Sequence, residues 1–300
     1  MSGIEKKCNL LNIRRVAIMS DIHSNYHAFK ACYEDAIKNG VNGFIFLGDY
    51  VSDLAEPREC LDLLYKIREK FPTICLRGNR ERYMLDCKNG TVSFSEGSRS
   101  GSLLFTYEKL REKDFDFFYS LKSADTVKID DINIQIAHAS MNDDRKYFDS
   151  NDTGIKTVID QMEYTYLLTG HSHKQYIYTN SGKTIINPGS VGIPQGGTPY
   201  PKYSILEIAN ENISCIFREV SYDLSEVIHA QFISGLVNHA KYWAIGILYD
   251  IITGDEMVIK LLKAVNNNGS INNEKVWHHE ATTLGLKFTE EEILDYYRSK

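Results

Sequence analysis

Five short apolar runs punctuate this chain, and each has the length and the β-branched or aromatic side chains of a β-strand. The runs are residues 16–19, 44–47, 73–76, 134–137 and 166–169. A carboxylate, amide or imidazole follows each run: Asp21-Ile22-His23, Gly48-Asp49, Gly78-Asn79, His138 and Gly170-His171-Ser172-His173. In an open α/β sheet, ligands bind outside the carboxyl ends of the strands. We therefore expect these scattered polar residues to meet in one crevice.

The first 120 residues alternate strand and helix patterns. Helices are expected at residues 26–38 and 57–70, between strands that end at Met19, Leu47 and Leu76. Pro57 suits the first position of a helix, where a missing N–H costs nothing, and Asn39-Gly40 is typical of a helix end. A polar loop at 91–102 then precedes a helix through Leu110. This βαβαβ order predicts an α/β fold.

From residue 125 the pattern changes to closely spaced short strands. Turn signals stand at Asp130-Asp131 and at Asn180-Ser181-Gly182, and they predict hairpins of a second sheet. Strands at 203–208 and 213–219, joined by Asn210-Glu211-Asn212, are expected to complete that second sheet.

After Tyr222 the apolar residues recur with a helical period, which predicts amphipathic helices. Asn273 is a candidate helix cap, and Thr289 with Glu292 forms a capping box. We divide the chain into a body, residues 1–221, and a helical extension, residues 222–300. Its apolar stripes are too short for an independent core, so we expect the extension to pack on the body. Trp277 and Tyr242-Trp243 are expected to make that contact, with substrate stacking as the alternative.

Charge and composition limit the partners. The net charge of −6 and a pI near 5.9 argue against binding to nucleic acid or an anionic membrane, but not against a small anionic substrate held by metal. Six scattered cysteines without a CxxC pair read as reduced thiols. The N-terminal segment lacks a signal-peptide pattern, and the longest apolar segment, residues 242–252, is too short to cross a bilayer. We expect a cytoplasmic protein.

The polar groups after the strands have the chemistry of metal ligands. Asp21 and His23 lie two positions apart on a strand end, where alternate side chains share one side, so both can reach one ion. Asp49 is a carboxylate that could bridge two cations. Each group alone is more often a turn or a structural histidine. Five such groups in a row, each behind a strand, favour a metal site instead.

The order of these groups resembles the calcineurin-like metallophosphoesterase superfamily, whose blocks are D-x-H, G-D, G-N-[HC]-[DE], a lone His and G-H-x-H. The resemblance extends over about residues 14–220 and implies a four-layer α/β/β/α sandwich of two mixed sheets. The segment 187–192, NPGSVG, resembles a loop of the bacterial small phosphodiesterase branch. The resemblance implies two metal sites that share Asp49: one formed by Asp21, His23, Asp49 and His173, the other by Asp49, Asn79, His138 and His171.

The chain departs from the superfamily at Arg80, where many members have the His that helps to protonate the leaving group or to position the phosphate. With a pKa above about 12, arginine can bind a phosphoryl oxygen but cannot release a proton. Arg80 therefore either binds phosphate or lies in solvent at a helix start. We take Asp49, Asn79, Arg80 and His138 as the catalytic set.

Two classes of function fit these observations. The first is an enzyme in which two divalent ions, Mn²⁺, Fe, Zn²⁺ or Co²⁺, activate a bridging hydroxide against a phosphate ester. Without an acid at Arg80, aryl phosphodiesters and nucleotide polyphosphates are favoured over alkyl monoesters, and a protein or small-molecule phosphomonoesterase is the alternative. The second is a scaffold without catalysis, as in the retromer subunit of this fold that has lost ligands. The complete ligand set favours the enzyme, and a homo-oligomer through the apolar extension stays open.

Overall fold

A computed structural model of the chain describes residues 15–209 and 212–300. The N-terminal segment, with Cys8, and Asn210-Glu211 of one predicted turn lie outside the described residues. The strands are β1 (Arg15–Met19), β2 (Gly43–Phe46), β3 (Thr73–Cys75), β4 (Ala124–Ile129), β5 (Ile132–Ala137), β6 (Tyr166–Leu168), β7 (Gln175–Asn180), β8 (Lys183–Pro188), β9 (Lys202–Ala209) and β10 (Asn212–Glu219).

The described helices comprise six in the body and five in the extension. Those of the body are α1 (Tyr26–Lys38), α2 (Pro57–Lys70), α3 (Asn79–Lys88), α4 (Gly101–Lys109), α5 (Glu112–Ser120) and α6 (Gly154–Asp160). Those of the extension are α7 (Leu224–Ile233), α8 (Leu236–Thr253), α9 (Met257–Asn268), α10 (Glu274–Thr283) and α11 (Glu290–Arg298). The sequence predicted α1 and α2 at these bounds, but it gave no sign of α5 or α6.

The strands form two mixed sheets. The first has the order β10-β9-β1-β2-β3, and the second has the order β4-β5-β6-β8-β7. β1, β2 and β3 run parallel, as do β5, β6 and β8, whereas the outer pairings are antiparallel. The parallel strands thus carry their carboxyl ends, with the predicted ligands, to the same edge of each sheet.

Apolar side chains fill the space between the two sheets. Ile18 and Ile45 of the first sheet share one buried cluster with Ile134 and Ile136 of the second. Each fully buried side chain of this kind stabilises the fold by about 1.5–3 kcal/mol. Because β2 is buried on both faces, it reads as a continuous apolar run rather than an alternating one.

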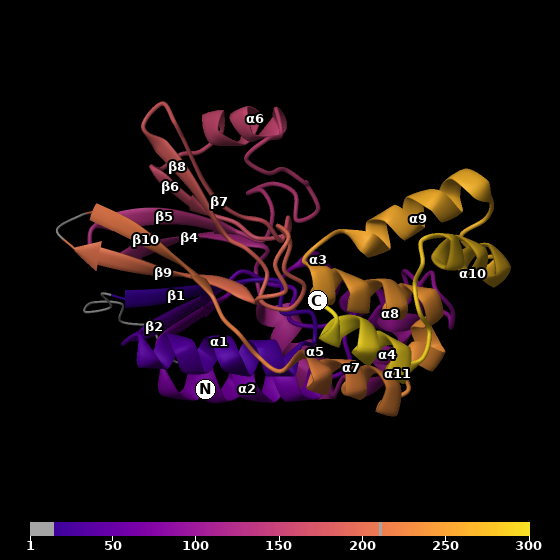
Figure 1. The fold of residues 1–300 in the computed structure, drawn as a ribbon. Coiled ribbons are helices and arrows are strands. Elements are labelled where there is room, and N and C mark those ends of the chain that lie inside the picture. The colour runs from indigo at the N-terminus through magenta and orange to yellow at the C-terminus, as the bar shows by residue number, and fades with distance from the viewer. Residues whose placement is uncertain (1–14, 210–211) are drawn as a thin grey trace.

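Helices cover the outer faces of both sheets. α1, α2 and α5 pack on the first sheet, and α6 packs on the second. Figure 1 shows α1 and α2 below the first sheet and α6 above the second. The predicted four-layer α/β/β/α sandwich of two mixed sheets, followed by a helical extension, is confirmed.

One prediction about the sheets is wrong. β9 and β10 belong to the first sheet, where β9 pairs antiparallel to β1, with Val16 opposite Leu206. The apolar pattern identified both strands but carried no information about which strand they would pair with. The partner depends on contacts far away in sequence, here with Leu206 and Ile208 in the core between the sheets.

The extension lies beside one end of the sandwich (Figure 1). Its helices enclose a buried cluster to which the body contributes only Leu54 and Ile193 among the described residues. Trp277 lies inside that cluster, not at the boundary where we expected it, and its indole N–H donates to the Ile271 carbonyl. This cluster is larger than the short apolar stripes suggested, and the division at residue 221 stays a prediction.

A second contact joins the extension to the body where α4 meets α8. Gly101 begins α4 so close to α8 that a Cβ there would stand 1.9 Å from the His239 carbonyl oxygen. A glycine is therefore required at this position. In the described part of the chain, no helix is both long and apolar enough to cross a membrane.

Candidate metal centre

The predicted ligands leave their strands through strained backbone. Of the seven, five have a positive φ: Asp21 (56°), His23 (48°), Asp49 (55°), His171 (64°) and His173 (60°). Non-glycine residues in such conformations cost about 1–3 kcal/mol each and cluster at functional sites. The loops after β1, β2 and β3 of the first sheet and after β5 and β6 of the second bring these residues together.

The first group consists of Asp21, His23 and His173, whose potential ligand atoms all lie within 4.8 Å of one another. The two imidazole Nε2 atoms are 3.1 Å apart, and Nε2 of His173 lies 3.5 Å from Oδ1 of Asp21. Oδ2 of Asp21 accepts a hydrogen bond from the backbone N–H of His171, which orients the carboxylate.

The second group consists of Asp49, His138 and His171, again within 4.8 Å. Nε2 of His138 is 3.5 Å from Oδ2 of Asp49 and 3.0 Å from Oδ1 of Asn79. Asn79 is the first residue of α3, so its amide is held at the helix start. The structure thus brings all seven predicted ligands into two adjacent groups.

Backbone carbonyls fix the orientation of two imidazoles. Nδ1 of His138 lies 2.8 Å from the Leu47 carbonyl oxygen, and Nδ1 of His173 lies 2.9 Å from that of Ile193. A carbonyl oxygen accepts, so each Nδ1 carries a proton, and each Nε2 faces the other ligand atoms of its group. Imidazoles that bind metal are usually held in this way.

The donor set and its charges fit divalent ions. Oδ1 of Asp21 is buried and has no hydrogen-bond partner in the described part of the chain. Burial alone would raise the pKa of Asp21, but the neighbouring imidazoles lower it well below its usual value, so it stays a carboxylate. Burial lowers the pKa of His171 to about 4, which keeps that imidazole neutral. Carboxylate, amide and imidazole ligands together suit Mn²⁺, Fe, Zn²⁺ or Co²⁺.

Glu81 organises the loops that carry Asp49 and Asn79, and our reading of the sequence gave it no role. Its Oε2 accepts hydrogen bonds from the backbone N–H groups of Asp49 (2.9 Å) and Gly78 (2.8 Å). Its Oε1 accepts one from Tyr50 (2.8 Å). Burial, followed by the Asp49 charge, raises the pKa of Glu81 to about 7. The sequence does hold a signal for Glu81, because the family pattern has an acidic residue at this place after Gly78-Asn79.

Asp53 is the second residue that the sequence did not reveal. Its Oδ2 lies 3.1 Å from the Arg80 guanidinium and 3.2 Å from Nδ1 of His23. Its Oδ1 accepts a hydrogen bond from the indole N–H of Trp243 in the extension, at 2.9 Å. Burial alone would raise the pKa of Asp53, but Arg80 and His23 hold it well below its usual range. The Asp53 carboxylate therefore contacts His23, Arg80 and Trp243 of the extension.

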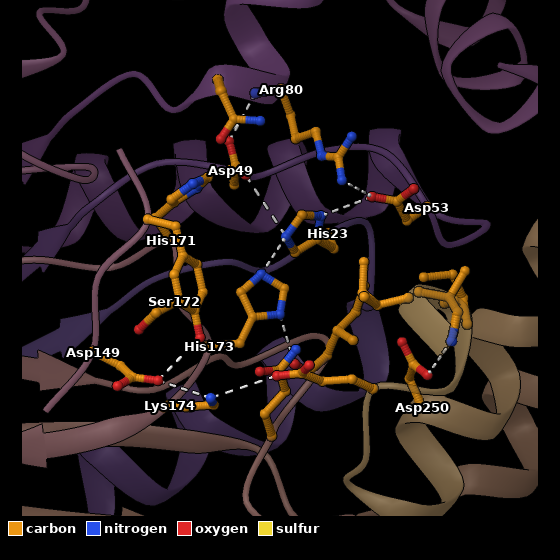
Figure 2. A pocket seen from close by; sticks show the side chains of 18 of the residues that line it. His23, Asp49, Asp53, Arg80, Asp149, His171, Ser172, His173, Lys174 and Asp250 are labelled. Carbon is orange, nitrogen blue, oxygen red and sulfur yellow. Dashed lines mark hydrogen bonds and ion pairs between the residues drawn. The ribbon is translucent and has the colours of Figure 1, made fainter. Parts of the chain in front are cut away.

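A pocket of about 610 Å³ opens beside the two groups. Arg80 lines it rather than lying free in solvent, and its side chain is 22% exposed. Figure 2 shows Arg80 with Asp53 on one side of His23 and the Lys174–Asp149 pair on another. Residues of the extension line the pocket as well, among them Trp243 and Asp250.

The comparisons with known proteins agree with this geometry. The calcineurin-like phosphoesterase superfamily domain matches residues 15–211. An uncharacterised protein of Methanocaldococcus jannaschii is 25% identical over 231 residues, which cover 70% of this chain and 89% of the archaeal protein.

Two solved structures share the fold. A metallophosphoesterase from Sphaerobacter thermophilus has a TM-score of 0.61 at 23% identity and covers 76% of this chain and 98% of its own. A hypothetical protein from Pyrococcus horikoshii has a TM-score of 0.66 at 18% identity, with 76% and 97% covered. Because the family match spans more than half of the chain, this protein belongs to the calcineurin-like phosphoesterase superfamily and is a metal-dependent hydrolase of phosphoric esters.

Proposed function

We propose that this protein binds two divalent metal ions and hydrolyses phosphodiesters or nucleotide polyphosphates. The position of Asp49 carries the proposal: its Oδ2 is 3.7 Å from Nε2 of His23 in the first group and 3.5 Å from Nε2 of His138 in the second. A carboxylate oxygen between two ligand groups is suited to bridge two ions, as in two-metal hydrolases.

In this proposal each ion has its own ligands besides the shared Asp49. Asp21, His23 and His173 hold one ion, and Asn79, His138 and His171 hold the other. When bound, two such ions lower the pKa of a coordinated water and neutralise charge on the phosphoryl oxygens. The protein residues contribute by holding these ligands rigidly, through Glu81 on the Asp49 loop and through the carbonyls that orient the imidazoles.

Arg80 binds the substrate phosphate in this proposal. Its guanidinium lines the pocket, where a charge-assisted hydrogen bond to a phosphoryl oxygen is worth about 1.5–3 kcal/mol. Burial alone would lower the pKa of Arg80, but Asp53 and Asp49 raise it above its usual value, so the guanidinium stays protonated and cannot act as the acid for the leaving group. Esters whose leaving group departs as a stable anion are therefore the better substrates.

Metal content and turnover test the proposal together. After dialysis against Mn²⁺, we expect about two ions per chain and hydrolysis of bis-para-nitrophenyl phosphate. Asp49→Asn should weaken both sites at once, because one carboxylate serves both. Asp125→Asn, the same change at a half-buried residue of β4 outside both ligand groups, is the matched control. A stoichiometry of one or zero in a folded protein at saturating metal would contradict the two-ion proposal.

We also propose that the protein is cytoplasmic and acts on a small phosphorylated substrate. The five described cysteines are all free thiols, as is usual in a reducing compartment. The net charge of −6 disfavours polyanionic partners such as nucleic acid. A cell fraction in which the protein cosediments with membranes or sits in an oxidising compartment would contradict this assignment.

A further inference from the structure

The pocket that contains the metal-ligand groups also has an apolar surface, which the extension largely builds. Trp243 and Ile247 of α8 and Val258 and Ile259 of α9 form this surface, together with Ile193 of the body. Figure 2 shows Asp250 of the extension across the pocket from Asp149 and Lys174. We call the five apolar residues the apolar wall.

We propose that the apolar wall binds the organic group of the phosphoric ester, and that this group is flat, uncharged and aromatic, such as an aryl ring or a nucleobase. The inference rests on the proposed function and names the substrate class for the same site. The volume of about 610 Å³ lies within the range of about 300–1,000 Å³ typical of small-molecule sites, so it has room for more than a phosphate.

The indole of Trp243 is held in a fixed position by the same carboxylate that holds Arg80. Asp53 accepts from the indole N–H at 2.9 Å and pairs with the guanidinium at 3.1 Å. The distance between the aromatic side chain and the phosphate-binding cation is therefore set by one buried residue. α8 is interrupted at Lys241 (φ 45°, ψ −119°), two residues before Trp243, and such strain persists where surrounding contacts impose it.

Of the two substrate classes in the proposed function, the charges that line the rest of the pocket favour phosphodiesters over nucleotide polyphosphates. Lys174 is already paired with Asp149 at 2.8 Å and with Glu256 at 3.5 Å. Asp250 is buried, and its Oδ1 accepts a hydrogen bond from the Val258 backbone N–H at 2.9 Å, so it adds no positive charge to the pocket. Apart from the metal-ligand groups, Arg80 and Asp53, the charged residues that line the pocket in the described part of the chain are two lysines against four carboxylates: Lys174, Lys263, Asp149, Asp152, Asp250 and Glu256. A further phosphate would meet no surplus of positive charge, whereas an uncharged ring would meet apolar side chains.

Intrinsic fluorescence reports on the wall without any turnover. The chain has two tryptophans, Trp243 in the pocket and Trp277, which is 0% exposed within the extension. Tryptophan is excited at a wavelength that adenosine does not absorb. Adenosine should then quench the emission of the full-length protein saturably, and ribose at the same concentration should not. In Trp243→Phe the remaining emission should not respond to adenosine.

Two alanine variants of α9 provide the matched pair. Ile259→Ala removes an apolar side chain from the wall, whereas Leu262→Ala removes one of similar size that packs in the extension's cluster outside the pocket. Ile259→Ala should weaken adenosine binding and lower kcat/KM for bis-para-nitrophenyl phosphate by roughly tenfold, and Leu262→Ala should change neither appreciably.

The outcomes separate this inference from the proposed function. Equal quenching by adenosine and ribose, or equal losses in both alanine variants, would overturn the apolar wall as a binding surface. Turnover of bis-para-nitrophenyl phosphate without any response to adenosine would overturn the wall alone. Selective adenosine binding in a metal-loaded protein that hydrolyses no ester would instead refute the proposed function and support the wall.

Discussion

Replacing Glu81 with Gln tests whether one buried carboxylate holds two ligand-bearing loops together. Each carboxylate oxygen of Glu81 accepts from the backbone: Oε2 from Asp49 and Gly78, Oε1 from Tyr50 and, at 3.4 Å, from Val51. In either orientation, a glutamine amide places its NH₂ group against the two backbone N–H groups that one carboxylate oxygen of Glu81 accepts from, so those two donors lose their acceptor. A buried donor left without an acceptor costs about 1–3 kcal/mol, so the two backbone N–H groups that lose their acceptor destabilise the fold by about 2–6 kcal/mol.

The metal sites should respond as well, because the loops that move carry Asp49 and Asn79. Changes in residues that orient metal ligands typically cost about 10–100-fold in metal affinity. We expect Glu81→Gln to lower Tm by at least about 2 °C and to weaken Mn²⁺ binding by that factor. Calorimetry and a chelator competition, both at about pH 8, where Glu81 is ionised, measure these effects. Glu69→Gln, the same change on the exposed side of α2, is the control. Equal Tm and equal metal affinity in the two variants would refute the reasoning.

Two further predictions concern Arg80 and the extension. Arg80→Ala should weaken phosphate binding and transition-state stabilisation by about 1.5–3 kcal/mol, and Arg80→His should raise activity on monoesters with poor leaving groups relative to activated diesters. Steady-state kinetics on both ester types measure this, and rates within about twofold in both variants would contradict it. Deleting residues 222–300 should expose Leu54 and Ile193 and remove Trp243 from Asp53, so light scattering should detect association. A soluble, monomeric and equally thermostable fragment would argue against a body that depends on the extension.

The sequence predicted which polar residues cluster at the strand ends because their signal is local. Each follows an apolar run, and the run is apolar because parallel strands such as β2 are buried on both faces. The helix boundaries at Pro57 and at Thr289 also agree with the structure, since a proline at the first turn and a capping box act within one turn of chain. Such signals depend only on neighbouring residues, so they can be recognised without knowing the fold.

Glu81 and Asp53 could not be assigned in this way. Glu81 binds backbone groups 32 residues earlier in the chain, and Asp53 meets Trp243, which lies 190 residues later. The family pattern has an acidic residue at the position of Glu81, but neither position in the sequence tells which distant backbone groups or which indole the carboxylate will bind. The pairing of β9 with β1 escaped prediction for the same reason, because strand propensity does not specify a partner.

Arg80 and the extension belong to one arrangement in the structure. A guanidinium in a pocket needs a counter-charge, and Asp53 supplies it with one oxygen while the other holds Trp243. A histidine at position 80 would provide a proton donor and would leave Asp53 without its Arg80 partner. The absence of a proton donor at position 80 and the position of the Trp243 indole are therefore linked through the Asp53 carboxylate. An aryl ester fits both consequences, because an aryl oxide leaves without protonation more readily than an alkoxide and its ring suits the apolar wall. Substrate preference and the attachment of the extension should therefore change together when Asp53 is altered, rather than independently.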